Sequence, residues 1–176
     1  MKNALIILLL VFLSLNLSSQ QKNVYKDDYL VKTGDTAPDF VISEAGGKSY
    51  RLSSLKGKVV MLQFTASWCS VCRKEMPFIE EEIWKPGKDS GLAVIGIDRD
   101  EPPEKVLNFK KEMGITYPLA LDRGAEIFSL FALKEAGVTR NVIIDRSGKI
   151  IFLTRLFDRE EFDRMKEVIF SELNKK

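Results

Sequence analysis

Two cysteines three residues apart are the side chains of this chain best suited to chemistry. Cys69 and Cys72 are the only cysteines among 176 residues, and they form a Cys-x-x-Cys motif. On the first turn of a helix, this spacing brings the two Cα atoms within the roughly 4.4–6.8 Å that a disulfide requires. Unpaired N–H groups and the helix dipole also favour a thiolate at a helix N-terminus. The motif predicts thiol–disulfide exchange, in which Cys69 attacks a substrate disulfide and Cys72 resolves the mixed disulfide.

The residue types that the chain lacks exclude several other kinds of site. The chain contains no histidine, which is the commonest metal ligand and general base. Two cysteines without histidine cannot complete a four-ligand zinc site of these residue types or form a Cys–His nucleophile pair. An inert structural disulfide is the alternative, although closing so short a loop adds little chain-entropy stabilisation. We expect no metal, and no cofactor beyond a redox-active disulfide between Cys69 and Cys72.

The motif lies between an expected strand and an expected helix. Residues 59–65 form an apolar run rich in β-forming residues, which is typical of a buried central strand. Residues 75–84 have helical spacing, with an apolar stripe on one side and the glutamates 80–82 expected toward water. Pro86-Gly87 is expected to end this helix. The first cysteine is therefore expected where a strand passes into a helix.

The rest of the chain alternates between strand and helix patterns. This order predicts an α/β fold with a central mixed β-sheet and helices on both faces. The expected elements are a hairpin of 40–42 with 49–52, strands at 92–97, 117–121, 142–144 and 150–154, and helices at 102–113, 125–133 and 159–173.

The N-terminal residues have the pattern of an export signal. Lys2 precedes an almost wholly apolar run at residues 4–15, and small and polar residues follow it. A run of about a dozen residues suits a signal-peptide core and is shorter than the roughly 20 residues of a membrane span. We assign residues 1–19 to a signal peptide, with an uncleaved anchor as the alternative, 20–33 to a polar linker and 34–176 to one domain. Export would place the cysteines where disulfides persist.

The stretch around the motif resembles a known family. Residues 64–77, Phe-Thr-Ala-Ser-Trp-Cys-Ser-Val-Cys-Arg-Lys-Glu-Met-Pro, are similar to the active-site stretch of thioredoxin-like proteins of the TlpA/ResA type. Residues 34–40, 94–97 and 142–150 resemble other segments of that family. The resemblance runs from Gly34 to the C-terminus. It implies a thioredoxin-like fold with an N-terminal β-hairpin extension, and an extracytoplasmic exchange protein that often reduces cysteines of exported proteins.

The resemblance assigns roles to four residues around the motif. Cys69 matches the nucleophile, Cys72 the resolving cysteine and Trp68 the aromatic flank that meets substrate, although simple packing would also explain a tryptophan there. Glu75 matches the family's acidic residue three positions after the second cysteine. It lies one helical turn beyond Cys72, so it could take or give the proton that exchange must move. A solvated helix carboxylate is the alternative.

Three departures from the thioredoxin pattern limit what the resemblance implies. Gln63 occupies the position of a buried acid, and Ser70-Val71 between the cysteines lacks the common proline. Thr139 stands where a cis-proline usually faces the cysteines, and we expect a trans bond before it because a cis bond there costs about 2.5–4 kcal/mol. Thr139 and Arg140 are candidate substrate contacts. Arg140 could hold a thiolate or a partner carboxylate, although a surface ion pair is the favoured reading.

Several functions use the same two cysteines. A reductant is preferred on the resemblance, with exported proteins carrying thiols or disulfides as partners and a membrane thiol donor upstream. A disulfide oxidase or isomerase differs only in reduction potential. A thiol peroxidase shares the fold, but its Thr-x-x-Cys pattern is absent because Ala66 lies three residues before Cys69. A copper(I)-binding module needs only two thiolates, yet the usual assisting histidine is missing. The net charge is +2 with lysines and arginines spread along the chain, which gives no reason to expect nucleic acid, so no nucleic-acid partner is expected. The oligomeric state is left open.

Overall fold

The structure, a computed structural model, describes residues 23–175. The expected signal peptide at 1–19, and the possible anchor at 4–15 within it, lie outside the described residues. Within residues 23–175, no helix is both long enough and apolar enough to cross a membrane.

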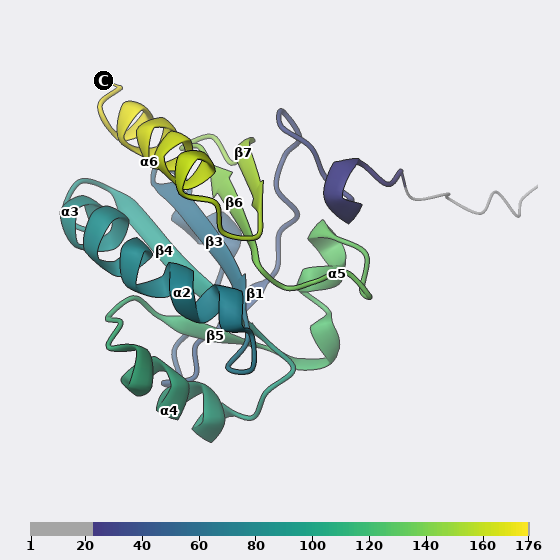
Figure 1. Ribbon diagram of the computed structural model, residues 1–176. Helices are drawn as coiled ribbons and strands as arrows, with labels where there is room; N and C mark the ends of the chain where they lie inside the picture. The colour runs from purple at the N-terminus through teal and green to yellow at the C-terminus, as the bar shows by residue number, and fades with distance from the viewer. Residues whose placement is uncertain (1–22, 176) are drawn as a thin grey trace, which may run out of the picture.

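A five-stranded mixed sheet forms the centre of the fold (Figure 1). Its strands are β3 (Val59–Thr65), β4 (Leu92–Arg99), β5 (Leu119–Asp122), β6 (Arg140–Ile144) and β7 (Ile150–Arg155). They lie in the order β5-β4-β3-β6-β7, in which β3, β4 and β5 are parallel and β6 and β7 run antiparallel to their neighbours. The apolar run at 59–65 thus forms the central strand, buried along its whole length, as its composition predicts.

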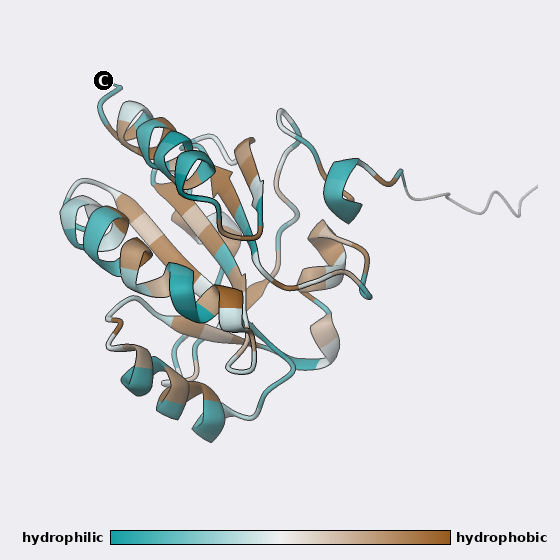
Figure 2. Ribbon diagram, viewed as in Figure 1, coloured by the Kyte–Doolittle hydropathy of each residue, from teal (hydrophilic) through white to brown (hydrophobic). Residues whose placement is uncertain are grey.

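One face of the sheet is covered by α2 (Ser70–Phe78), α4 (Pro103–Met113) and α6 (Arg159–Leu173). Met76 of α2, Phe109 of α4 and Met165 of α6 belong to one apolar cluster with Met61 of β3. Figure 2 shows largely hydrophilic outer turns on α4 and α6 against apolar strands. The helix at 159–173 has its predicted bounds, and α4 ends at Gly114, whose positive φ of 64° suits glycine.

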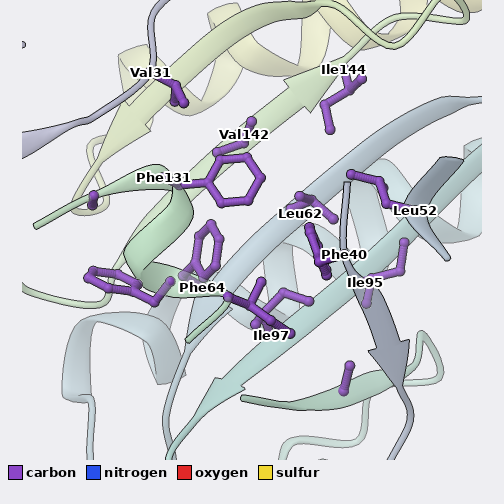
Figure 3. Close-up of a cluster of buried hydrophobic side chains, with 14 of the residues drawn as sticks. Val31, Phe40, Leu52, Leu62, Phe64, Ile95, Ile97, Phe131, Val142 and Ile144 are labelled. Atoms are coloured by element: carbon purple, nitrogen blue, oxygen red, sulfur yellow. The ribbon is translucent and has the colours of Figure 1, made fainter. Parts of the chain in front are cut away.

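The opposite face is covered by α5 (Phe128–Phe131) and by N-terminal segments. Figure 3 shows Phe64 and Leu62 of β3 packed with Phe131 and with Phe40, which precedes the hairpin. The ring centroids of Phe64 and Phe131 lie 5.4 Å apart. The predicted hairpin is formed by β1 (Val41–Ser43) and β2 (Ser49–Arg51), and the 3-10 turn η2 (Leu52–Leu55) follows it. The sheet therefore has helices on both faces and an N-terminal hairpin, as predicted.

The helix after the cysteines is longer than expected. It begins at Ser70 and continues beyond α2 through a π-helical segment, η3 (Ile79–Trp84), into α3 (Lys85–Gly87). The expectation that Glu80 faces water is wrong, because its side chain is buried. Its carboxylate accepts hydrogen bonds from the backbone N–H and the hydroxyl of Thr116, at 2.8 and 2.7 Å. These donors come from a loop 36 residues away, which helical periodicity does not reveal.

The helix expected at 125–133 is much shorter in the structure. A 3-10 turn, η4 (Arg123–Ala125), precedes it, and α5 covers only Phe128–Phe131. The carboxylate of Asp122 accepts hydrogen bonds from the N–H groups of Ile127 and Phe128, which sets the start of the helix. After α5 the chain becomes extended, and Ala132 forms a β-bridge with Tyr29.

Residues 23–33, the described part of the expected linker at 20–33, pack against the domain. They include the short 3-10 turn η1 (Lys26–Asp28), and Tyr29 and Val31 are buried. The Tyr29 hydroxyl donates a 2.7 Å hydrogen bond to the Thr154 carbonyl of β7. Tyr25 also packs against the same apolar cluster, so apolar side chains anchor this stretch and the linker expectation is wrong for these residues.

Candidate active site

The two cysteines lie at the junction of β3 and α2, as the sequence predicts. Cys69 is the N-cap of α2, and it forms a disulfide with Cys72 across a Cα–Cα distance of 5.3 Å. The Sγ atom of Cys69 accepts a 3.2 Å hydrogen bond from the backbone N–H of Cys72. Cys69 keeps 7% of its surface exposed and Cys72 none. Cys69 is therefore the sulfur that a partner can approach, and Cys72 can act only from beneath it.

Thr139 lies directly against both sulfurs. Its hydroxyl oxygen is 3.2 Å from the Sγ of Cys69 and 3.4 Å from the Sγ of Cys72. Its carbonyl accepts a 3.0 Å hydrogen bond from the N–H of Leu156, which ties its loop to the end of β7. Every peptide bond among residues 23–175 is trans, including the one before Thr139. The structure thus places Thr139 opposite the cysteines, where sequence reasoning placed it.

Arg140 does not take part in this site, contrary to both sequence readings of it. Its side chain is fully buried, so it makes no surface ion pair. Successive residues of a strand point to opposite faces of the sheet, so the Arg140 side chain points away from the face that carries the side chains of its neighbours Thr139 and Asn141. Its guanidinium lies 4.6 Å from the ring centroid of Tyr29 and donates to the carbonyls of Gly137 and Asp27. Arg140 instead fastens the N-terminal segment to the domain.

Trp68 is the most exposed large apolar side chain in the described part of the chain, with 63% of its surface accessible. This exposure excludes packing as its role. It follows Ser67 and directly precedes Cys69, so an aromatic surface adjoins the accessible sulfur. Aromatic side chains in such positions contribute strongly to contacts with protein partners.

The Glu75 side chain is buried between α2 and the sheet, so it is not a solvated helix carboxylate. Its side chain receives a 2.6 Å hydrogen bond from the amide of Asn141 on β6 and a 3.3 Å hydrogen bond from the amide of Gln63 on β3. Gln63 in turn accepts from the Tyr117 hydroxyl at 2.8 Å, and Asn141 also donates to the Thr154 hydroxyl at 2.9 Å. These five side chains form one buried polar network.

Burial raises the pKa of Glu75 to about 7, and the hydrogen bonds from Asn141 and Gln63 oppose that rise. A carboxyl group with this pKa exists in both forms near neutral pH. It lies one helical turn beyond Cys72. The arrangement can therefore hold a proton close to the buried cysteine and release it again without a histidine.

The network contains residues that sequence reasoning missed. Gln63 stood out only as a replacement for a buried acid, whereas the structure uses it as a donor to Glu75. Asn141 carried no signal, because its partnership depends on the antiparallel register that sets it opposite Gln63. Tyr117 was expected only as part of a strand. No group of three or more potential metal ligands of the Cys, Asp and Glu types occurs among residues 23–175.

Comparison with known proteins agrees with this geometry. A family model described as Redoxin matches residues 32–169. The thiol-disulfide oxidoreductase ResA of Bacillus anthracis is 34% identical over 127 residues, 72% of each chain. ResA of Geobacillus kaustophilus is 29% identical over 170 residues, 96% of this chain and 94% of its own.

Solved structures share the fold. The solution structure of a putative protein disulfide isomerase from Bacteroides thetaiotaomicron is 59% identical, with a TM-score of 0.82 over 86% of this chain and 96% of its own. The crystal structure of a putative thiol:disulfide interchange protein DsbE from Chlorobium tepidum is 26% identical, with a TM-score of 0.73 over 82% of this chain and 99% of its own.

Proposed function

Because the chain belongs to the redoxin family, as a ResA-like thiol–disulfide oxidoreductase of thioredoxin-like fold, we propose that it works outside the cytoplasm as a reductant of cysteine pairs in exported proteins. After each turnover the Cys69–Cys72 disulfide must be reduced again, and we propose that a membrane thiol protein supplies these electrons. The apolar run at residues 4–15 supports export.

The observation that carries the direction of exchange is the set of groups around the sulfurs. The side chain within hydrogen-bond distance of both sulfurs is the neutral hydroxyl of Thr139. Arg140 is directed elsewhere, and Arg73, which directly follows Cys72 in α2, donates its hydrogen bond to the Ser67 carbonyl and not to a sulfur. A strong oxidant owes its high potential to a stabilised thiolate in the reduced form. The start of α2 and the N–H of Cys72 favour the Cys69 thiolate, but among residues 23–175 no lysine or arginine side chain donates a hydrogen bond to either sulfur. The lack of that further stabilisation favours the Cys69–Cys72 disulfide and makes the dithiol a better reductant.

The reaction proceeds in two exchanges. The Cys69 thiolate attacks one sulfur of a partner disulfide, forms a mixed disulfide and releases the other partner sulfur as a thiolate. Cys72 then gives its proton toward Glu75 and attacks the Sγ of Cys69, which frees the second partner sulfur. The partner gains two electrons and two protons as a dithiol, and the protein is left with the Cys69–Cys72 disulfide.

The reduction potential of the Cys69–Cys72 couple tests the direction. Tryptophan fluorescence is followed across glutathione or dithiothreitol buffers, because Trp68 adjoins the disulfide, and Cys72→Ser is the control. We expect a reversible two-electron transition below about −230 mV. A midpoint above about −180 mV would contradict the reductant and favour an oxidase or isomerase.

A disulfide isomerase is the second candidate, since the solved structure from Bacteroides thetaiotaomicron bears that name. An isomerase rearranges disulfides through one accessible cysteine, so Cys72→Ser would keep part of the activity on a scrambled substrate protein. A reductant loses turnover in that variant because the mixed disulfide is not resolved. Export is tested separately, by locating the full chain and a variant lacking residues 1–19 in cell fractions.

A further inference from the structure

A second buried carboxyl group lies close to the active site and takes no part in the Glu75 network. Asp98, near the end of β4, is fully buried, and neither carboxylate oxygen has a donor among the described residues. It pairs in register with Thr65 of β3, whose hydroxyl contacts Met76 of α2. Registered residues of neighbouring strands share a face, so Asp98 lies on the face of the sheet that α2 covers.

The partner of Asp98 is another carboxyl group, Glu101. Burial and the neighbouring Glu101 raise the pKa of Asp98 to about 8. For Glu101 itself, burial is outweighed by hydrogen bonds from Lys105 and Ser67, which lower its pKa. The pair therefore holds one proton at neutral pH, on Asp98, while Glu101 stays ionised.

Glu101 binds Ser67, which lies two residues before the nucleophile Cys69. Its carboxylate accepts hydrogen bonds from the backbone N–H of Ser67 at 2.6 Å and from the Ser67 hydroxyl at 2.7 Å. The carbonyl of Ser67 accepts a 3.1 Å hydrogen bond from the guanidinium of Arg73. Ser67 is thus held by charged side chains at its amide, its hydroxyl and its carbonyl, and Trp68 and Cys69 follow directly.

We propose that Glu101, supported by Asp98, is a positioning residue of thiol–disulfide exchange: it fixes Ser67 and thereby sets how Trp68 and the Cys69 sulfur are presented to a partner. It touches no reacting atom and acts through Ser67. Hydrogen bonds to an ionised acceptor are shorter and stronger than neutral ones, so an ionised Glu101 holds this loop far better than an amide would. The inference rests on exchange at Cys69, in whichever direction it runs.

The charge state of Asp98 depends on groups from several elements. Glu101 and Asp122 oppose its ionisation, while Lys105 of α4 favours it and also forms a 2.5 Å ion pair with Glu101. When Asp98 ionises above about pH 8, two like charges face each other beneath Ser67. The hydrogen bonds between Glu101 and Ser67 are then expected to weaken.

The test compares Glu101→Gln with Glu104→Gln, a matched change at an exposed glutamate three residues along the chain. The reduced full chain is reacted with oxidised glutathione, and the rate of Cys69 with iodoacetamide is followed between pH 5 and pH 10. Loss of charge-assisted hydrogen bonds predicts a glutathione rate about tenfold lower for Glu101→Gln, and a rate within about twofold of wild type for Glu104→Gln. A Glu101→Gln rate equal to that of wild type would overturn the proposal.

A double variant separates positioning from general loss of structure. Ser67→Ala removes only the hydroxyl donor and is expected to lower the rate about threefold. Added to Glu101→Gln it should lower the rate little further, because the acceptor of that hydroxyl has already lost its charge. Independent, fully multiplied losses would contradict coupling through Ser67.

Two further outcomes keep the test decisive. If Glu101→Gln does not unfold cooperatively, Ser67→Ala decides alone, and a wild-type rate and iodoacetamide profile in that variant refute the proposal. If the wild-type chain does not react with oxidised glutathione, exchange itself fails. A reactive wild type with an equally reactive Glu101→Gln refutes only the positioning role.

Discussion

Two buried carboxyl groups on the same face of the sheet, Glu75 and Asp98, have opposite kinds of neighbour. Glu75 receives amide hydrogen bonds from Asn141 and Gln63. Asp98 receives none within residues 23–175, and it faces the carboxylate of Glu101. Burial raises the pKa of both, to about 7 for Glu75 and about 8 for Asp98.

The difference teaches that the partners of a buried acid decide what its proton can do. Amide donors stabilise the ionised form, so the pKa of Glu75 stays close enough to neutral pH for the carboxyl group to take up and release its proton. A neighbouring carboxylate stabilises the protonated form instead, so Asp98 keeps its proton and leaves Glu101 charged. The first site suits proton transfer to and from Cys72, and the second suits holding a loop in place.

The largest effect is expected when Glu75 loses its ability to titrate. In Glu75→Gln, resolution of the mixed disulfide by Cys72 should slow by about a hundredfold at pH 7, which is within the range of general acid–base contributions. Quenched-flow measurement of the mixed disulfide with glutathione gives the rate. The increase in rate as pH rises through about 7 should also vanish. Glu81→Gln, at an exposed position on the same helix, is the control.

A wild-type resolution rate in Glu75→Gln would contradict the comparison of the two acids, because Glu75 would then transfer no proton to or from Cys72, like Asp98.

Replacing the other acid should alter the pH dependence of stability. The folded pKa of Asp98 lies above its ordinary value of 3.8, so its contribution is fully present below about pH 4 and is lost as pH rises through about 8. Asp98→Asn should therefore lose less stability than wild type between pH 5 and pH 9, by a few kcal/mol at roughly 1.4 kcal/mol per pKa unit. Urea unfolding at the two pH values measures it.

The same experiment on Glu75→Gln is the comparison, since the pKa of Glu75 is raised in the same direction but less far. Parallel pH profiles for Asp98→Asn and wild type would indicate that Asp98 is ionised in the folded protein.

A smaller effect is expected from removing one donor of Glu75. Asn141→Ala should raise the pKa of Glu75 further, by about one unit, since a charge-assisted hydrogen bond contributes about that much. Gln63→Leu should raise it less, because the Gln63 hydrogen bond is 3.3 Å long and that of Asn141 is 2.6 Å. Carbon-13 NMR titration of the Glu75 carboxyl reports both. A lower pKa in Asn141→Ala would contradict the role of the amide as a donor.

The smallest change is expected at the outer end of the network. Tyr117→Phe removes the hydroxyl that donates to Gln63 and leaves the buried ring in place. Unfolding free energy should fall by about 1 kcal/mol, the net value of a neutral hydrogen bond. The pKa of Glu75 should move less than in Asn141→Ala. A larger movement would mean that Tyr117 orients the Gln63 amide.

Much of the fold could be predicted because it follows from local patterns. The apolar run at 59–65 and the periodicity at 159–173 match β3 and α6 at both ends. Where prediction failed, distant residues decided the outcome. Thr116 supplies the hydrogen bonds that buried Glu80 needs, whereas Asp122 sets the start of α5 and the β-bridge of Ala132 with Tyr29 follows its end.

By itself the sequence predicted the exchange chemistry, since two cysteines three residues apart at a strand–helix junction have the spacing that a disulfide requires and place the first cysteine at a helix N-terminus. The position of Thr139 opposite them was implied by the resemblance to thioredoxin-like proteins. Only the tertiary structure decided the environment of the acids. Burial depends on which strands meet, so the register of Gln63 with Asn141 and of Thr65 with Asp98 set the partners of Glu75 and Asp98. The same strand alternation turned Arg140 away from the sulfurs, because side-chain direction follows from the placement of the whole strand.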